Sequence, residues 1–172
     1  MIRGSYIKIV FAYIVLVLAQ VTVFKDVILF ESAFCFIYLL IFLLVSKDTN
    51  PLLQLLLGFT TGLLLDSFYN TQGIHAAVST FIMFIRPFWI SMNTPSGGFD
   101  MGSKLNVREH SLQWFVMYAF PLIFIHNTLL FLIEASNFSF FWNTLGKAFF
   151  SSLFTFVVIV MVQYLFIKKE KY

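Results

Sequence analysis

The sequence predicts an all-α integral membrane protein, a six-transmembrane-helix bundle in a single domain covering residues 1–172. Only 11% of the residues are charged and 60% are hydrophobic, whereas soluble domains average roughly 25% charged residues. So few charges cannot cover a water-soluble surface. The apolar runs are continuous and lack the alternation of a transmembrane barrel. Helices are therefore expected, because a helix satisfies its own backbone hydrogen bonds in lipid.

Six apolar runs approach the roughly 20 residues that a helix needs to cross a bilayer. The third run has an apolar core of only about 14 residues, a length at which a re-entrant segment is the alternative. The fourth is interrupted by Arg86-Pro87. The expected spans are 6–24, 27–45, 52–65, 74–92, 112–133 and 145–167, and residues 93–111 form the main cytoplasmic loop.

The basic residues predict the orientation. With six spans and the N-terminus inside, nine Lys and Arg residues lie on the inner side and two on the outer side. This positive-inside pattern places both termini in the cytoplasm. An alternative for the first run is a secretory signal cleaved after Ala19, which fits the charges equally well. The inner residues are Arg3, Lys8, Lys47, Arg86, Lys104, Arg108, Lys168, Lys169 and Lys171, and the outer ones are Lys25 and Lys147.

A stripe of small and polar residues marks the third run. Residues four apart lie on one face of a helix, so Gln54, Gly58, Gly62 and Asp66 form one line. Glycines at this spacing let another helix approach closely, either within the bundle or from a partner. Alternatively, the glycines are scattered and Asp66 merely ends the helix at the membrane surface. As a buried anchor, Asp66 has several candidate partners: backbone amides, Lys25, Lys147 and His75.

Other polar residues have structural interpretations. Arg86 is expected to extend toward the cytoplasmic surface, helped by a kink at Pro87; a buried ion pair or a partner contact is the alternative. His126 is expected to make an interhelical hydrogen bond, and His75 to bond Asp66. The loop bases, Lys104 and Arg108, are candidates for contact with anionic lipid or an acidic partner surface.

No arrangement of residues indicates catalysis. Outer carboxylates can in principle bind a cation or act as acid and base, but separate solvated helix ends are the simpler interpretation. The three His residues and the single Cys have no metal-ligand spacing, and there is no H-E-x-x-H, G-x-S-x-G or P-loop motif. We therefore expect no enzyme activity, no metal and no cofactor. The carboxylates concerned are Asp26, Glu31, Asp66 and Glu134.

The third and fourth runs carry a resemblance to a known family. The pattern Gly-Phe-x-x-Gly-Leu-Leu-x-Asp is followed by a polar turn with Gly, and then by an Ala-containing helix that ends in Arg-Pro. Together with the length and the basic termini, it resembles the MreD family of rod shape-determining proteins. Outside this pattern the chain matches the family only in hydropathy. The matching residues are Gly58, Phe59, Gly62, Leu63, Leu64, Asp66, Gly73, Ala76, Ala77, Arg86 and Pro87.

The resemblance implies a non-catalytic scaffold subunit of the bacterial cell-wall elongation complex, multi-pass in the cytoplasmic membrane. It implies an MreC-like bitopic partner, indirect association with a RodA-type polymerase and a class B penicillin-binding protein, and proximity to the actin-like MreB filament. No nucleic acid is expected. The implied fold is similar to the substrate-binding subunits of energy-coupling-factor transporters. The alternative is therefore a vitamin or lipid-precursor transporter subunit, with an outward cavity lined by Glu31, Asp66, His75 and Trp or Tyr faces.

Overall fold

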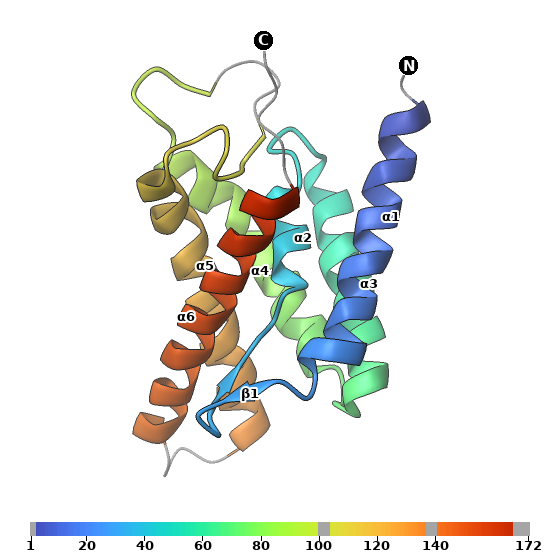
Figure 1. Cartoon of the computed structure of the whole chain (residues 1–172), viewed down its shortest axis with the longest axis vertical. Helices are drawn as coiled ribbons and strands as arrows, with labels where there is room; N and C mark the ends of the chain where they lie inside the picture. The colour runs from blue at the N-terminus through green and yellow to red at the C-terminus, as the bar shows by residue number, and fades with distance from the viewer. Residues whose placement is uncertain (1–2, 100–103, 137–140, 167–172) are drawn as a thin grey trace.

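Long helices lie side by side through most of the computed structural model (Figure 1), which describes residues 3–99, 104–136 and 141–166. Four helices in this part are long and apolar enough to cross a membrane, as expected for an all-α membrane protein. A shorter apolar helix, α1 (Arg3–Ala19), precedes them and continues directly into a π-helix, η1 (Gln20–Phe24). The four long helices are α3 (Pro51–Tyr69), α4 (Ile74–Met92), α5 (Leu112–Ala135) and α6 (Phe141–Phe166).

Helix α3 is longer than its apolar core predicted. It begins with Pro51 at its first position, and the Asn50 side chain accepts a hydrogen bond from Leu52 N at 2.8 Å. These are standard N-terminal signals. It ends at Asn70, which adopts the left-handed conformation that commonly closes a helix. The polar end of the run is therefore helical, and its 19 residues are enough to cross a membrane.

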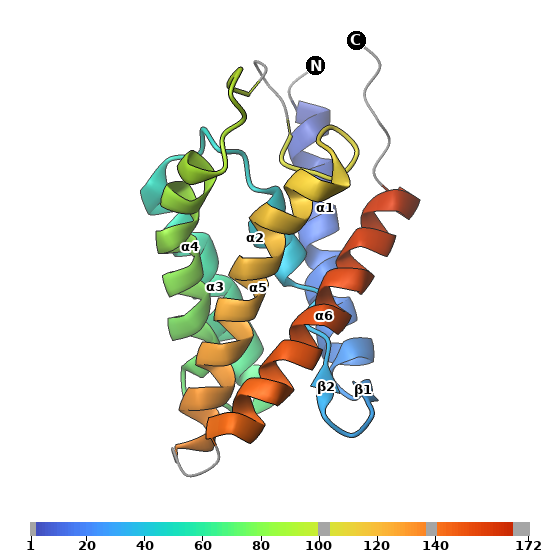
Figure 2. The ribbon, with the colours of Figure 1, turned by 90° about the vertical axis from the view of Figure 1, so that its left-hand side faces the viewer.

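The predicted span 27–45 is not a continuous helix, so six helical spans are not confirmed. It starts as an antiparallel hairpin of β1 (Ile28–Leu29) and β2 (Ala33–Phe34). Only α2 (Leu39–Leu44) is helical, and six residues are too few to cross a bilayer. The segment still leads from the hairpin to the opposite end of the bundle (Figures 1 and 2). Hydropathy could not reveal this, because a chain buried inside protein is as apolar as a helix facing lipid.

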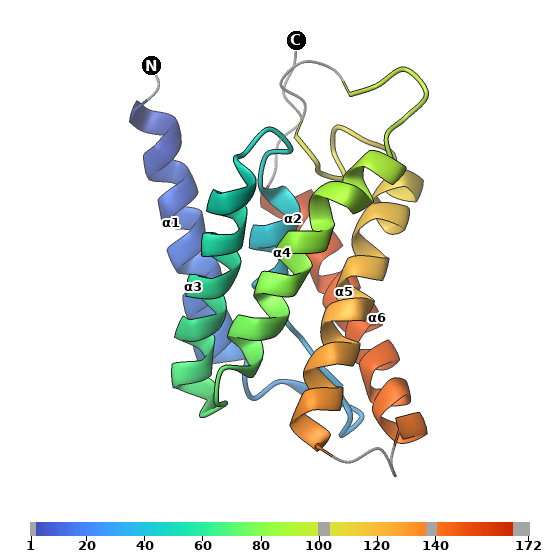
Figure 3. The same cartoon turned by 180° about the vertical axis from the view of Figure 1, so that it is seen from behind.

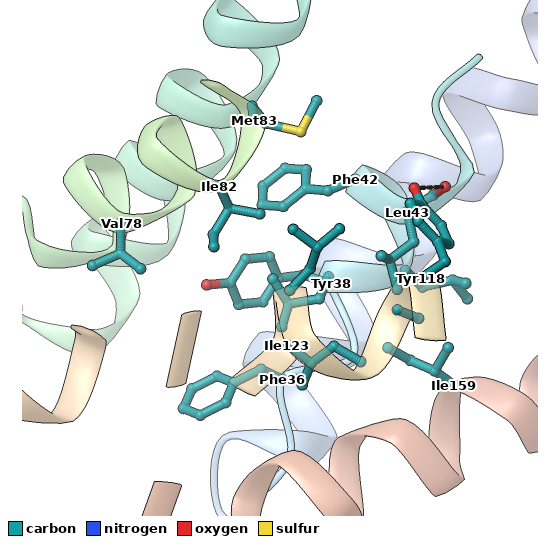
Figure 4. Packing of buried hydrophobic residues seen from close by; sticks show 14 of the residues in the cluster. Phe36, Tyr38, Phe42, Leu43, Val78, Ile82, Met83, Tyr118, Ile123 and Ile159 are labelled. Atoms are coloured by element: carbon teal, nitrogen blue, oxygen red, sulfur yellow. Dashed lines mark hydrogen bonds between the residues drawn. The ribbon is translucent and has the colours of Figure 1, made fainter. Parts of the chain in front are cut away.

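The hydrophobic core surrounds residues 27–45, which we call the broken segment. Every residue from 35 to 40 is buried, whereas α3, α4, α5 and α6 expose large apolar side chains on their outer faces. In Figure 4, Phe36, Tyr38 and Phe42 lie among side chains from three helices, including Ile82 of α4 and Ile123 of α5. The broken segment is thus the centre of the molecule, and the helices form its wall.

The long helices pack on one another in chain order, which places the glycine-containing face of α3 against α4. Helix α3 packs on α4, α4 on α5, and α5 on α6, while β2 lies against α6. Helix α1 is at the edge beside α3 (Figures 1 and 3), where the hydroxyl groups of Tyr13 and Thr61 are 3.2 Å apart. Helix α1 begins and α6 ends toward one end of the bundle. The hairpin and the α3–α4 turn lie at the other, which we call the hairpin end (Figure 2).

Candidate functional site

The stripe on α3 faces α4 along its whole length. Gln54, Gly58, Gly62 and Asp66 are all buried. A Cβ atom at Gly62 would lie 2.4 Å from both the Cα of Ala76 and the carbonyl oxygen of His75. A Cβ at Gly58 would lie 2.8 Å from a backbone oxygen of α4. Both distances are shorter than van der Waals contact, so the helices can approach this closely only where α3 has glycine. The close contact lies within the chain, which leaves this face closed to a partner.

Asp66 caps the start of the neighbouring helix. Its Oδ1 accepts a hydrogen bond from His75 N and its Oδ2 accepts one from Ala76 N, both at 2.9 Å. The Thr71 hydroxyl donates to Oδ1 at 2.5 Å. The first amides of a helix have no partner within it, and the positive end of the helix dipole favours an anion. Of the candidate partners, backbone amides and the His75 ring are used, while Lys25 and Lys147 are not.

The Asp66 network also fixes the tautomer of His75. The His75 Nδ1 lies 3.2 Å from Asp66 Oδ1 and 3.0 Å from Thr71 Oγ1. The Thr71 hydroxyl donates its hydrogen to the Asp66 carboxylate. Nδ1 of His75 therefore carries the hydrogen that it shares with Asp66 Oδ1 and Thr71 Oγ1, and Nε2 of the neutral ring is an acceptor. Nε2 is buried and lacks a hydrogen-bond partner among the described residues. An unpaired buried acceptor costs about 1–3 kcal/mol. No hydroxyl or thiol of the described residues is hydrogen-bonded to His75 Nε2.

Arg86 is fully buried at the other end of the stripe, so the expectation that it reaches the membrane surface is wrong. Its Nη1 donates to Gln54 Oε1 at 3.0 Å and its Nε to the Tyr118 hydroxyl at 2.9 Å. Its Nη2 donates to the carbonyl oxygens of Leu43 and Val45. The Tyr118 hydroxyl also donates to Leu43 O at 2.9 Å (Figure 4). No carboxylate of the described residues pairs with this guanidinium.

These contacts show what the buried cation does. The last carbonyls of α2 have no partner within the helix, and none is available in lipid. A guanidinium offers five donors and a positive charge, which suits the negative end of a helix. Arg86 thus closes a short helix inside the bundle. Pro87, expected to kink this region, lies inside α4, which continues to Met92.

The extended part of the broken segment is held by polar side chains of its neighbours. Gln20 of η1, and Ser151 and Thr155 of α6, are all buried. They bond the backbone from Phe34, the last residue of β2, to Tyr38, just before α2. Sequence reasoning missed these residues, although polar side chains within apolar runs were the available signal. The bonds are Phe34 N to Ser151 Oγ (3.0 Å), Phe36 N to Thr155 Oγ1 (3.0 Å), Gln20 Nε2 to Cys35 O (3.0 Å) and Tyr38 N to Gln20 Oε1 (3.4 Å).

His126 joins α5 to the broken segment. Its Nε2 lies 2.6 Å from the Tyr38 hydroxyl, and its Nδ1 lies 3.0 Å from Asn127 Oδ1. Asn127 Nδ2 in turn donates to Ser152 Oγ on α6 at 3.0 Å. The hydrogen bond from α5 to α6 that was expected of His126 is therefore made by Asn127. The His126 ring instead bonds Tyr38 of the broken segment.

The described part of the 93–111 loop folds back on α6. Arg108 Nη2 donates to the Tyr164 carbonyl, and the guanidinium carbon lies 4.8 Å from the centre of the Tyr164 ring. Val107 N donates to Gln163 Oε1 at 3.0 Å. The Lys104 side chain is exposed. Of the two bases expected to meet lipid or a partner, Arg108 is therefore already engaged within the chain.

A pocket of about 180 Å³ opens at the hairpin end, between η1, β2, the α3–α4 turn, the end of α5 and the start of α6. We call it the hairpin-end pocket. His75 lines it, but Asp66 and Glu31 do not, and Glu31 is exposed on the hairpin turn. Among the described residues, no three His, Cys, Asp or Glu side chains are grouped to hold a metal. Its charged lining residues are Lys25, Asp26, Glu134 and Lys147, and its aromatic walls include Phe34, Phe36, Tyr69 and Phe131.

Comparison of the chain with known protein families, curated proteins and solved structures finds no significant match. Function is therefore inferred from the residues and the way they are arranged. Two features stand out, the closely packed α3–α4 pair with its Asp66 cap and the hairpin-end pocket with its charged lining.

Proposed function

We propose that this protein is a non-catalytic scaffold subunit of the bacterial cell-wall elongation complex, as its resemblance to the MreD family implies. The observation that carries this proposal is that the residues shared with the MreD family pattern hold the chain's own helices together. Gly58, Gly62, Asp66 and Arg86 all contact, cap or bond other parts of the same chain. These residues hold α3, α4 and α2 together and are themselves engaged in doing so, which suits a platform that positions other proteins.

In this proposal the chain lies in the bacterial cytoplasmic membrane. Both termini and the 93–111 loop face the cytoplasm, and the hairpin end faces outward. The direct partner is an MreC-like bitopic protein. A RodA-type polymerase and a class B penicillin-binding protein associate indirectly, and the MreB filament lies on the cytoplasmic side. The basic inner loops and the four apolar helices support this placement.

The partner helix needs a face other than the glycine stripe, because α4 occupies that stripe. We propose the outer groove between α3 and α4, whose walls include Phe59, Phe81 and Phe84 and whose lining includes Gly73 and Ala77. Small residues let a second helix come close in a membrane. The groove lining is almost entirely apolar, which suits a transmembrane helix as occupant.

Affinity purification of the full chain in mild detergent tests both the proposed groove and the proposed scaffold function. The wild-type chain should retain a single-span partner with an extracytoplasmic domain. Ala77→Phe fills the groove with an exposed side chain and should reduce the retained partner roughly tenfold, a loss of about 1.4 kcal/mol. Ala12→Phe adds the same bulk on the exposed face of α1 and should change nothing. Normal retention by Ala77→Phe would overturn the groove, and no single-span partner on wild type would overturn the function.

The lining of the hairpin-end pocket supports the transporter-subunit alternative in part. The hairpin-end pocket is lined by His75 and by Tyr69, which match the histidine and the Tyr face that this alternative requires. Glu31 and Asp66 do not line it, and Asp66 is committed to capping α4. Uptake of a vitamin or lipid precursor that depends on this chain and on an ATP-hydrolysing partner would favour the alternative over the scaffold.

A further inference from the structure

A groove of about 420 Å³ lies between the turn of the hairpin and residues 150–157 of α6, and we call it the hairpin groove. Strand β2 packs against α6 (Figure 2), and both elements contribute to its walls. The walls are apolar side chains, among them Leu29, Phe30 and Leu153. Of its described lining residues only Ser32 is polar, and the Ser32 hydroxyl already donates to Phe30 O at 2.8 Å. The groove therefore suits an apolar occupant.

The length of the groove favours a lipid chain over a transmembrane helix. Residues 150–157 extend about 10 Å along α6 at 1.5 Å per residue. A partner helix would need contacts along the roughly 30 Å of hydrocarbon that it crosses. The Phe30 side chain is 93% exposed on the hairpin turn and lines the groove, so it obstructs a straight helix lying along α6. A flexible acyl chain can fill a short groove beside such an obstacle.

A cationic side chain lies near the hairpin end of the groove. Lys147 precedes Phe150 by about one turn of α6, on the side where α6 begins. Its Nζ lies 4.5 Å from the ring centre of Phe34, the residue that follows Ala33 of the groove, and 4.2 Å from that of Phe131. A charge at this end of an apolar groove is complementary to a lipid whose anionic group lies at the membrane surface.

The ammonium group of Lys147 is accessible and lacks a counter-charge. No carboxylate of the described residues forms an ion pair with it. The aromatic ring faces attract the cation but leave its N–H donors unused. Lys147 is half-buried, yet its Nζ is not among the buried unpaired atoms of the described residues, so a ligand can reach this nitrogen.

We propose that a phospholipid of the leaflet at the hairpin end binds here, with an acyl chain in the hairpin groove and phosphate oxygens that accept from Lys147 Nζ. Apolar walls alone would hold any chain, and an ammonium group alone would attract any anion. An amphiphile with a phosphate next to its chains uses both. The hairpin-end pocket beside Lys147 carries charges of both signs, so the phosphate and the chain are recognised, and not the rest of the head group. This site lies outside the α3–α4 groove, and the proposal goes beyond the scaffold function.

Three probes separate the two contacts. Dioleoyl phosphatidylglycerol is compared with dioleoylglycerol, which lacks the phosphate, and with glycerophosphoglycerol, which lacks the chains. Native mass spectrometry of the purified full chain in detergent measures binding. Because hydrogen bonds to charged groups are the stronger ones, phosphatidylglycerol should bind roughly tenfold tighter than dioleoylglycerol. Glycerophosphoglycerol should not bind measurably. Equal binding of phosphatidylglycerol and dioleoylglycerol would overturn the contact with Lys147, and with it the proposal.

A variant that fills the groove tests where the chain lies. Ser32→Phe should weaken phosphatidylglycerol binding roughly tenfold. Ser67→Phe adds the same bulk on the exposed face of α3, where the Ser67 hydroxyl bonds only its own helix, and should bind as wild type does. If Ser32→Phe does not fold, Leu153→Trp narrows the same groove from α6. A filled groove that releases a co-purifying protein, or dissociates a dimer, while lipid binding is unchanged would mean that a helix occupies it, and would overturn the proposal.

A second variant tests the phosphate contact. Lys147→Gln should weaken phosphatidylglycerol binding roughly tenfold and leave dioleoylglycerol binding unchanged, which distinguishes a lost phosphate contact from a damaged fold. Lys47→Gln, at the opposite end of the bundle, is the matched control and should bind both probes as wild type does. Unchanged affinity of Lys147→Gln for phosphatidylglycerol would overturn the proposal.

Discussion

At the scale of single residues, two glycines set the spacing of the α3–α4 pair. Their environments differ in what a side chain would meet. At Gly62 the obstacle is the α4 backbone itself at 2.4–2.5 Å, which cannot move without breaking the Asp66 cap. At Gly58 the overlap is smaller: the nearest atoms are the Ser79 carbonyl oxygen at 2.8 Å and Met83 Cγ at 2.9 Å, and the Met83 side chain can adopt another rotamer. The two positions of one GxxxG motif are therefore unequal.

Gly62→Ala should lower the free energy of unfolding by about 3 kcal/mol, and Gly58→Ala by about 1 kcal/mol, the range that overpacking costs in a close-packed core. Gly146 in α6 is the control, because a Cβ there meets nothing within 4 Å. Gly146→Ala should be neutral or stabilise by up to about 1 kcal/mol through helix propensity. Reversible unfolding in SDS measures all three. Equal losses at the three positions would contradict this account of the stripe.

How far the sequence predicts the site can be judged at this scale. Spacing alone placed Gln54, Gly58, Gly62 and Asp66 on one face, and the structure keeps them on one face. Spacing could not choose between a partner and α4 as the neighbour of that face. Nor could it predict the burial of Arg86, because the acceptors that balance its charge are carbonyl oxygens of α2. Backbone acceptors leave no mark in the sequence.

At the scale of elements, the broken segment depends on hydrogen bonds from outside itself. Helices α4 to α6 were predictable, because each apolar run is long. The crossing by α3 was less certain, because its apolar core has only about 14 residues. Residues 27–45 are equally apolar, so hydropathy gave them the same assignment. What distinguishes them is a set of polar residues elsewhere, Gln20, Ser151 and Thr155, that satisfy their backbone. Irregular backbone is tolerated at membrane depth where protein supplies such partners, and this pairing exists only in three dimensions.

Thr155→Val tests this dependence. The change keeps the side-chain shape but removes the oxygen that accepts from Phe36 N at 3.0 Å. A buried N–H left unpaired should cost about 1–3 kcal/mol, and the Phe36 amide should exchange with deuterium faster. Thr60→Val is the matched control, since the exposed Thr60 hydroxyl bonds only its own helix. That variant should stay within about 0.5 kcal/mol of wild type. Equal stability of the two variants would show that the broken segment does not depend on the hydrogen bond to Thr155.

At the scale of the whole molecule, the path of residues 27–45 decides the topology. This segment runs from the hairpin end to the opposite end through the core (Figure 2). If the bundle spans the membrane, this segment crosses it although only α2 within it is helical. The number of crossings is then even. The positive-inside pattern then holds with both termini in the cytoplasm. A method that counts helices would miss this crossing and place the two ends of the chain on opposite sides.

Cysteine labelling on each side of the broken segment tests the crossing. The chain has one cysteine, Cys35, which is 1% exposed and should not react until the protein is denatured. Glu31→Cys on the hairpin turn and Asp48→Cys before α3 place exposed thiols at its two ends. In intact spheroplasts a membrane-impermeant maleimide should label Glu31→Cys, and Asp48→Cys only after lysis. Wild type is the control for Cys35. Labelling of both from one side would mean that the segment enters and leaves by the same face. That result would contradict both the path of the segment through the core and the placement of α1 beside α3.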